Sequence, residues 1–275
     1  MQSHRRQRAT IEQEQARVLR NDAVGPAYYR IALRCSPGYR HAAAGQFVML
    51  RPTASLDPLL RRPFSIHRLV GSGDTVQGIE LLYKVVGPVT QRMAALKADD
   101  VLDLLGPLGT GFRLPAAPGR IFLVAGGIGI APLLFLVLRL QEHGTDLSKC
   151  RLFLGGRTRR DLLCREDFAQ LGIPTDLSTD DGSSGDRCLV TQPFERLTRQ
   201  EPPDLIYACG PMDMLRCVIE VAAARRIPCQ VSIETMMACG IGACLGCAVA
   251  SRRTAGRYLH ACLDGPVFDG DDLYA

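Results

Sequence analysis

The sequence predicts an antiparallel β-barrel, then an α/β domain built on a parallel sheet, and finally a small cysteine-rich segment. Short β-type stretches separated by Gly and Pro fill roughly the first 115 of the 275 residues, without a long helix between them. The next 110 or so alternate apolar strand, glycine-bearing turn and helix. Three cysteines then share one short loop. We therefore expect three parts, at residues 1–115, 116–228 and 229–275.

Composition argues against several functional classes. The 33 basic and 28 acidic side chains leave a net charge of +5, and the only dense basic run is at residues 4–8, so no nucleic-acid partner is expected. We interpret this run as a solvated tail, with a weak anionic contact as the alternative. Eleven cysteines without a secretory signal predict a reducing cytoplasm. The longest apolar run, 128–138, is too short to cross a membrane.

In the first part, β-segments are expected at 15–21, 27–35, 46–51, 78–86 and 100–105. Residues 11–19 also fit a short helix, because Glu, Gln and Ala favour that state, but the turn at Gly25 and Pro26 favours a strand. A short helix fits residues 90–97. Residues 115–118 form the predicted linker.

The second part is predicted from three strand–turn–helix repeats. Strands are expected at 120–125, 151–154 and 205–209, followed by helices that end near residue 143, span about 160–171 and span 214–225. A glycine-bearing turn follows each strand. In parallel sheets, ligands bind at the carboxyl ends of the strands, so these turns are the candidate cofactor site.

The first of these turns has the glycine pattern of a phosphate-binding loop. Its residues are Gly126, Gly127, Gly129 and Pro132. Such a turn lets a pyrophosphate approach the backbone and meet the positive end of the helix dipole. Taken alone, the pattern is also typical of tight strand-to-helix packing. The two similar turns that follow favour a nicotinamide dinucleotide, NAD.

The other two turns offer further candidate ligands. Arg157 presents a forked donor for phosphate or ribose oxygens. Asp180 is placed to accept from ribose hydroxyls, although Asp180 and Asp181 also suit a plain turn. Cys209 is expected against the reacting nicotinamide ring, as a catalytic residue, or else is a small buried hydrophobe; Gly210 and Pro211 follow it.

The strongest metal signal is the spacing of four cysteines. Cys239, Cys244 and Cys247 are separated by four and two residues, and Cys262 follows after fourteen more. This is the plant-type spacing of a [2Fe–2S] cluster. Four thiolates also suit zinc, but zinc sites more often pair two short knuckles. The intervening glycines, at 240, 242 and 246, are predicted to adopt positive φ so that backbone N–H groups point at sulfur.

A cluster and a nicotinamide in one chain imply a third redox group. Nicotinamide moves electrons in pairs, as hydride, whereas the cluster moves them singly, so a flavin is needed between them. Arg62, Pro63, Phe64 and Ser65 combine a cation, a rigid proline and a hydroxyl suited to a flavin. An ordinary basic turn is the alternative.

With these motifs the chain resembles the ferredoxin–NADP reductase superfamily, and within it the family of iron–sulfur, electron-transfer subunits of bacterial NAD-dependent dihydroorotate dehydrogenase. The resemblance covers about residues 15–270, and its most specific parts are the segments 237–244 and 262–268. It implies that the four cysteines hold a [2Fe–2S] cluster. It also implies FAD, with contacts at the segment 62–65 and at Leu82, Tyr83, Lys84, Val89 and Thr90.

The chain departs from the family at residues 87–90, where relatives usually read Gly-x-Gly-Thr. Pro88 lacks an N–H, and Val89 has a side chain where a flavin pyrophosphate is expected close to the backbone. The resemblance further implies a partner, an FMN-containing catalytic subunit that oxidises dihydroorotate, in a heterotetramer of two plus two.

We therefore predict an electron relay in pyrimidine biosynthesis, from the partner's FMN through [2Fe–2S] and FAD to NAD⁺. The alternatives are a flavin and iron–sulfur subunit of an NAD(P)H–ferredoxin oxidoreductase or sulfide dehydrogenase, and a non-catalytic zinc-bound adaptor. Arg157, Arg159 and Arg160 also leave NADP open as the dinucleotide.

Overall fold

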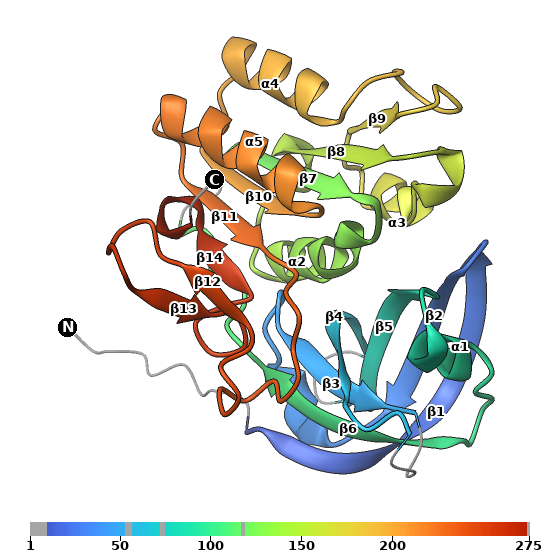
Figure 1. Cartoon of the computed structure of the whole chain (residues 1–275). Coiled ribbons are helices and arrows are strands. Elements are labelled where there is room, and N and C mark those ends of the chain that lie inside the picture. Colours follow the sequence, from blue (N-terminus) through green and yellow to red (C-terminus); the bar gives the residue numbers. More distant parts are fainter. Residues whose placement is uncertain (1–9, 53–56, 72–74, 117–118, 274–275) are drawn as a thin grey trace.

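The computed structural model describes residues 10–52, 57–71, 75–116 and 119–273. It contains a barrel, an α/β domain and a C-terminal segment beside that domain (Figure 1). The basic run at residues 4–8 and part of the predicted linker 115–118 lie outside the described residues.

The first domain is a closed antiparallel barrel in the order β1-β2-β5-β4-β3-β6. Residues 12–19 form the start of β1, so the helical alternative for 11–19 is wrong, because strand pairing with β2 and β6 outweighs local propensity. The helix predicted at 90–97 begins at Pro88, which suits a first helical turn, and ends at Ala94. The barrel elements are β1 (Glu12–Gly25), β2 (Tyr28–Arg34), β3 (Phe47–Arg51), β4 (Arg62–Val70), β5 (Gly78–Lys84), α1 (Pro88–Ala94) and β6 (Val101–Leu108).

The second domain has a six-stranded sheet in the order β14-β11-β10-β7-β8-β9. Along β7, Ile121, Leu123 and Ala125 face one core cluster, whereas Phe122 and Val124 face another. This alternation buries both faces of the strand, with α2 and α3 on one side and α4 and α5 on the other (Figure 1). The elements are β7 (Ile121–Gly126), α2 (Ile130–Glu142), β8 (Cys150–Gly156), α3 (Arg165–Gln170), β9 (Thr175–Thr179), α4 (Thr191–Gln200), β10 (Leu205–Cys209) and α5 (Met212–Ala224).

The structure differs from the prediction between β8 and β10. The helix expected over 160–171 is shorter, because Thr158 caps a separate 3-10 turn at Arg159–Asp161 and Cys164 has φ +58°. Strand β9 and helix α4 were not predicted. Only one residue of β9 is strongly apolar, and α4 is mostly polar with a narrow buried face that includes Phe194, so neither gave a clear periodic signal.

The segment after residue 228 is anchored to the sheet at both ends. Its first strand, β11 (Cys229–Ser232), pairs in parallel with β10, and its last, β14 (Val267–Asp269), pairs antiparallel with β11. Between them lie the cysteine loop and a hairpin of β12 (Ala248–Ala250) and β13 (Tyr258–His260). The parallel sheet thus carries the cysteine loop.

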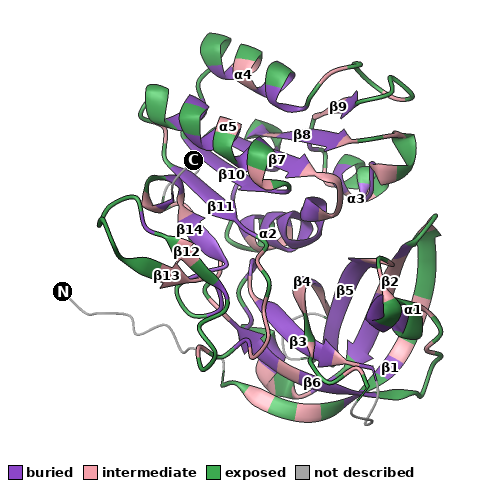
Figure 2. Cartoon of the chain, in the orientation of Figure 1, coloured by how far each residue is buried: buried purple, intermediate pink, exposed green. Residues whose placement is uncertain are grey.

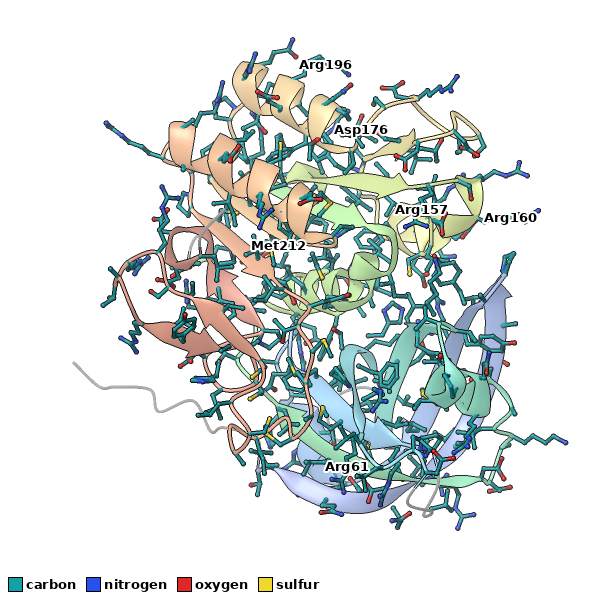
Figure 3. All side chains as sticks on the ribbon, viewed as in Figure 1. Arg61, Arg157, Arg160, Asp176, Arg196 and Met212 are labelled. Atoms are coloured by element: carbon teal, nitrogen blue, oxygen red, sulfur yellow. The ribbon has the colours of Figure 1, made fainter. Side chains whose placement is uncertain are left out.

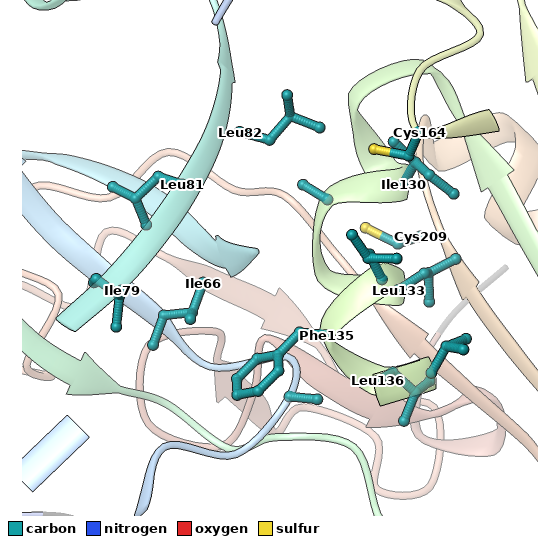
Figure 4. Packing of buried hydrophobic residues seen from close by; sticks show 14 of the residues in the cluster. Ile66, Ile79, Leu81, Leu82, Ile130, Leu133, Phe135, Leu136, Cys164 and Cys209 are labelled. Carbon is teal, nitrogen blue, oxygen red and sulfur yellow. The ribbon is translucent and has the colours of Figure 1, made fainter. Parts of the chain in front are cut away.

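One continuous core joins the barrel to the α/β domain. Helix α2 lies between them, and Ile130, Leu133 and Phe135 on it belong to the same buried cluster as Ile66 and Leu81 of the barrel (Figure 4). The strands around this junction are largely buried (Figure 2). The two domains are therefore fixed relative to each other by packing, which also fixes the pockets between them.

Candidate functional site

A pocket of about 420 Å³ lies between the barrel and the α/β domain. Its lining is mostly apolar, and it draws on strands β4 and β5 and on the start of α1. All nine barrel residues expected to contact a flavin line it: Arg62, Pro63, Phe64, Ser65, Leu82, Tyr83, Lys84, Val89 and Thr90.

The Thr90 side chain caps the turn at residues 87–90. Thr90 Oγ1 accepts hydrogen bonds from the N–H groups of Val86, at 2.9 Å, and Gly87, at 3.1 Å. The Val89 side chain is only 6% exposed and packs in the core. The valine side chain is therefore largely packed into the core, and only part of it borders the pocket.

A second pocket, of about 870 Å³, lies at the carboxyl ends of the parallel strands. Six of the predicted nucleotide residues line it: Gly126, Gly127, Arg157, Asp180, Gly210 and Pro211. The other three, Gly129, Pro132 and Cys209, line the first pocket instead. The turn and the β10 terminus thus lie between the two pockets, so a ligand in one can reach a ligand in the other.

Gly129 allows α2 to begin directly against the end of β10. A Cβ at this position would lie 2.2 Å from the carbonyl oxygen of Cys209. Cys209 itself is 3% exposed, and burial, reinforced by the charge of Glu234, raises the pKa of its thiol to about 12. Cys209 therefore presents a neutral thiol to the pocket.

Arg157 and Asp180 occupy the outer part of the second pocket. Both are exposed, and Arg157 projects from the segment that follows β8, near Arg160 (Figure 3). The neighbouring Asp181 instead accepts from the backbone N–H of Ser183 at 2.9 Å and from its hydroxyl at 2.6 Å. The two acids therefore differ: Asp181 forms the turn, and Asp180 lines the pocket.

Sequence reasoning missed a polar contact between the domains at this pocket. The Tyr28 hydroxyl donates to Asp161 Oδ1 at 2.6 Å, and Lys84 Nζ lies 3.6 Å from the same oxygen. All three residues line the second pocket. Nothing in the sequence pairs Tyr28 or Lys84 with an acid more than seventy positions away. Sequence reasoning also missed Glu234, which follows β11. The rule that ligands bind at the carboxyl ends of strands could have indicated it.

The four predicted cysteines come together in two pairs. The Sγ atoms of Cys247 and Cys262 are 3.2 Å apart and both side chains are buried. The backbone N–H of Cys244 lies 3.4 Å from Cys239 Sγ. Within the described residues, no three His, Cys, Asp or Glu side chains converge on a point that would hold a single ion. The side chain of Cys244 also interacts with Cys239, so the four sulfurs form two pairs.

Backbone donors in this loop stabilise negative charge on sulfur. Burial tends to raise the pKa of Cys239, but hydrogen bonds from the backbone of Ile241, Cys244 and Ala243 outweigh it and lower that pKa to about 7. Burial, followed by the adjacent Cys247 thiol, raises the pKa of Cys262 to about 12. A metal bound by Cys262 would therefore have to displace the proton of its thiol.

The loop glycines follow the prediction in part. Gly240 has φ +74° and Gly242 has φ +81°, as expected. Gly246 does not adopt positive φ; Leu245, at +57°, takes the left-handed conformation in its place. A Cβ at Gly240 would lie 2.5 Å from Cγ of Met49, because the loop packs directly on strand β3 of the barrel.

Two family models match the chain. Residues 234–274 match the iron–sulfur cluster binding domain of dihydroorotate dehydrogenase B, and residues 123–220 match an oxidoreductase NAD-binding domain. The first match favours iron–sulfur over zinc for the four cysteines. Among the described residues, no helix has the length and apolar character needed to span a bilayer.

Curated relatives match almost the whole chain. The electron transfer subunit of dihydroorotate dehydrogenase B (NAD⁺) from Desulforamulus reducens is 38% identical over 254 residues, 92% of this chain and 95% of that protein. The Bacillus caldolyticus subunit is 40% identical over 232 residues, 83% of this chain and 86% of that protein.

Solved structures share the architecture. An NADH-dependent reduced ferredoxin–NADP oxidoreductase superposes with a TM-score of 0.80 at 27% identity, covering 95% of this chain and 90% of that one. A ferredoxin–NADP⁺ reductase from Neisseria gonorrhoeae, solved with FAD and NADP, gives 0.63 at 17% identity, covering 77% and 91%, and supports the fold alone.

The barrel, the parallel sheet and the cysteine loop define an oxidoreductase of the ferredoxin–NADP reductase fold with NAD-binding and iron–sulfur regions. Relatives at 34–40% identity over most of the chain narrow this class further. The chain belongs to the family of electron transfer subunits of dihydroorotate dehydrogenase B (NAD⁺).

Proposed function

We propose that the first pocket holds FAD through the nine barrel residues that line it. Arg62 is exposed, and among the described residues it bonds only the backbone carbonyls of Leu60 and Arg61, so its guanidinium retains donors for a phosphate. Phe64 and Tyr83 meet edge to face and form an aromatic wall. When bound, FAD supplies the chemistry that exchanges electron pairs for single electrons.

The second pocket is proposed to hold NAD(H). Its glycine turn, Gly126 and Gly127, leaves backbone open to a pyrophosphate, and Gly129 and Pro132 continue it into α2. Arg157 and Asp180 are the proposed partners of phosphate and ribose oxygens. Cys209, followed by Gly210 and Pro211, closes the end nearest the first pocket. A carboxylate at the adenosine ribose favours NAD over NADP.

The cysteine loop is proposed to hold a [2Fe–2S] cluster, ligated by Cys239, Cys244, Cys247 and Cys262. The observation that carries the proposal is continuity between the three sites. Met237, two residues before the first ligand, lines the flavin pocket, and so does Pro266, four residues after the last. The flavin pocket in turn shares its wall with the nucleotide pocket. The sites therefore lie in the order cluster, flavin, nucleotide.

The partner is proposed to dock on the cysteine loop. Large apolar side chains around it are exposed: Met236 by 90%, Leu245 by 57%, Leu263 by 53% and Ile241 by 49%. Such a patch beside a redox centre fits a protein partner that delivers electrons. We propose the FMN-containing catalytic subunit of dihydroorotate dehydrogenase, two copies with two of this chain, acting in cytoplasmic pyrimidine biosynthesis.

Reconstitution tests this function. The FAD- and cluster-loaded chain should co-purify with the catalytic subunit and confer dihydroorotate-dependent reduction of NAD⁺ on it. Met236→Glu with Leu263→Glu should weaken the association about tenfold or more, because each charge enters an apolar contact. The control is Val101→Glu, 45% exposed on the barrel, which should leave it unchanged. Failure to bind, together with reduction of ferredoxin, would favour the ferredoxin oxidoreductase instead.

A further inference from the structure

The two pockets meet along a shared wall in which one charged group has no partner. Val86 and Ile128 supply apolar surface there. The cation of the wall is engaged, since Lys84 Nζ lies 3.6 Å from Asp161 Oδ1 and 4.8 Å from the ring centroid of Tyr28. Glu234 forms no hydrogen bond or ion pair with any described residue. The four residues that line both pockets are Lys84, Val86, Ile128 and Glu234.

Glu234 lies at the carboxyl edge of two adjacent strands. It follows β11 by two residues, and Ser232, the last residue of that strand, is in register with Cys209 at the end of β10. The negative charge of Glu234 contributes to the raised pKa of the Cys209 thiol. Glu234 is exposed and borders both pockets, yet partial desolvation by the surrounding protein raises the pKa of its carboxyl group. A carboxyl group in this setting is stabilised when a cation arrives beside it.

The shared wall is also where a nicotinamide ring has to lie, an argument that rests on the proposed function. Hydride transfer needs reacting atoms about 3–3.5 Å apart, so a dinucleotide in the second pocket must extend its ring to the flavin in the first. The ring of NAD⁺ carries a positive charge. Hydride, one proton with two electrons, leaves the reduced flavin and bonds to the ring carbon. The flavin is thereby oxidised, the nicotinamide is reduced, and the ring becomes neutral.

We propose that Glu234 is a specificity-determining residue that distinguishes oxidised from reduced nicotinamide. Its carboxylate attracts the cationic ring of NAD⁺ and loses this attraction once the ring is reduced. The site then favours binding of the substrate NAD⁺ and release of the product NADH. Lys84 does not reverse this preference, because Asp161 offsets its charge.

Binding measurements test the proposal without turnover. The FAD- and cluster-loaded protein is titrated with NAD⁺ and with 1,4,5,6-tetrahydronicotinamide adenine dinucleotide, whose neutral ring cannot reduce the flavin. In Glu234→Gln the Kd for NAD⁺ should rise about tenfold, equivalent to about 1.4 kcal/mol, while the Kd for the neutral analogue changes less than about twofold. Glu234→Asp, which keeps the charge, should retain most of the preference. Glu220→Gln, on the exposed side of α5, is the control for net charge and should change neither Kd.

Equal weakening of both ligands in Glu234→Gln would overturn the proposal, because a role in shape or hydrogen bonding predicts that result. Unchanged binding of both would overturn it too. The wild-type protein also tests the proposal if a variant fails to fold. Equal affinities of the wild-type protein for NAD⁺ and for the neutral analogue would contradict it. If wild-type protein binds neither dinucleotide, the proposed nucleotide pocket fails instead.

Discussion

The nucleotide pocket and the cysteine loop are held in different ways. The pocket lies at the ends of strands whose side chains are buried on both faces, and Ile121, Leu123 and Val124 on β7 have no exposed surface. The loop from 234 to 247 has no regular secondary structure, and most of its side chains retain exposure. The pocket is shaped by hydrophobic packing before any ligand binds.

We expect the cysteine loop to depend on a bound metal to a much greater degree. The four cysteines proposed as ligands are the groups best placed to join the ends of the loop, because Cys262 is separated from Cys247 by the β12–β13 hairpin. Ligand bonds in such small modules contribute directly to the free energy of folding. We therefore expect that loss of a ligand disorders the loop, whereas the parts of the two pockets that come from the barrel and the parallel sheet stay formed.

Removing a ligand sulfur should have the largest effect. Cys262→Ser should abolish the cluster, so that iron content and visible cluster absorbance fall nearly to zero and the C-terminal segment becomes sensitive to protease. Bound flavin should stay above about half of the wild-type level, because the barrel does not depend on the cluster. Cys217→Ser, outside the ligand set on α5, should keep its iron. Loss of flavin and iron together would contradict the difference between the regions.

The packed junction between the barrel and α2 should be sensitive to acid. His67 is fully buried between the barrel and α2, where its Nδ1 lies 2.8 Å from the carbonyl oxygen of Ala131. Burial, together with the nearby charges of Arg30 and Arg68, lowers the pKa of His67 to about 4, although the carboxylate of Glu80 opposes the shift. The other ring nitrogen of His67 lies 3.9 Å from the thiol of Cys164.

The folded protein therefore holds neutral His67, whereas the unfolded chain titrates near pH 6.5. Its contribution to stability is complete above pH 6.5 and declines as the pH falls toward 4, by about 3 kcal/mol in total. In His67→Gln this decline should be absent, so the difference in free energy of unfolding between the two proteins should change with pH over that window. Denaturant titrations at several pH values measure it, and a constant difference would contradict the assignment.

Backbone conformation in the loop gives a smaller effect. Gly240→Ala forces an L side chain into positive φ against Met49, which should cost roughly 1–2 kcal/mol and hasten iron loss on chelator challenge. Gly246→Ala is the matched control, since its Cβ would lie 3.7 Å from Cys244 Sγ in ordinary contact. Equal iron-loss rates in the two variants would mean that the metal alone sets the loop conformation.

The regions also differ in how well they could be predicted from the sequence. The two-domain architecture followed from apolar periodicity and Gly or Pro spacing, and the cysteine set from spacing alone. Strands with clear apolar runs, such as β7 and β10, were predicted to within a residue or two. Strand β9 and helix α4 were not predicted, because they contain few apolar residues and are buried mainly by tertiary contacts.

The sequence indicated site residues that a local motif or the family resemblance marks, but not contacts between distant segments. The nine residues predicted to contact a flavin line one pocket. The segment 62–65 was predicted from its own residues, whereas the five at 82–84, 89 and 90 followed only from the family resemblance. The contact of Tyr28 and Lys84 with Asp161 joins two domains and leaves no local pattern. Leu245 in place of Gly246 at positive φ reflects how the loop closes, which spacing alone does not reveal.

The smallest effect concerns the flavin side of the comparison, at the turn of residues 87–90. Thr90→Val keeps the shape but removes the oxygen that accepts from the backbone of Val86 and Gly87, at a cost of about 1 kcal/mol in stability. The Kd for FAD should rise a few-fold, measured by flavin fluorescence, because the turn beside the pocket loosens. Thr90→Ser keeps the oxygen and should bind FAD like the wild type. Equal affinities in all three proteins would show that packing of α1, with Val89 in the core, fixes the turn without its cap.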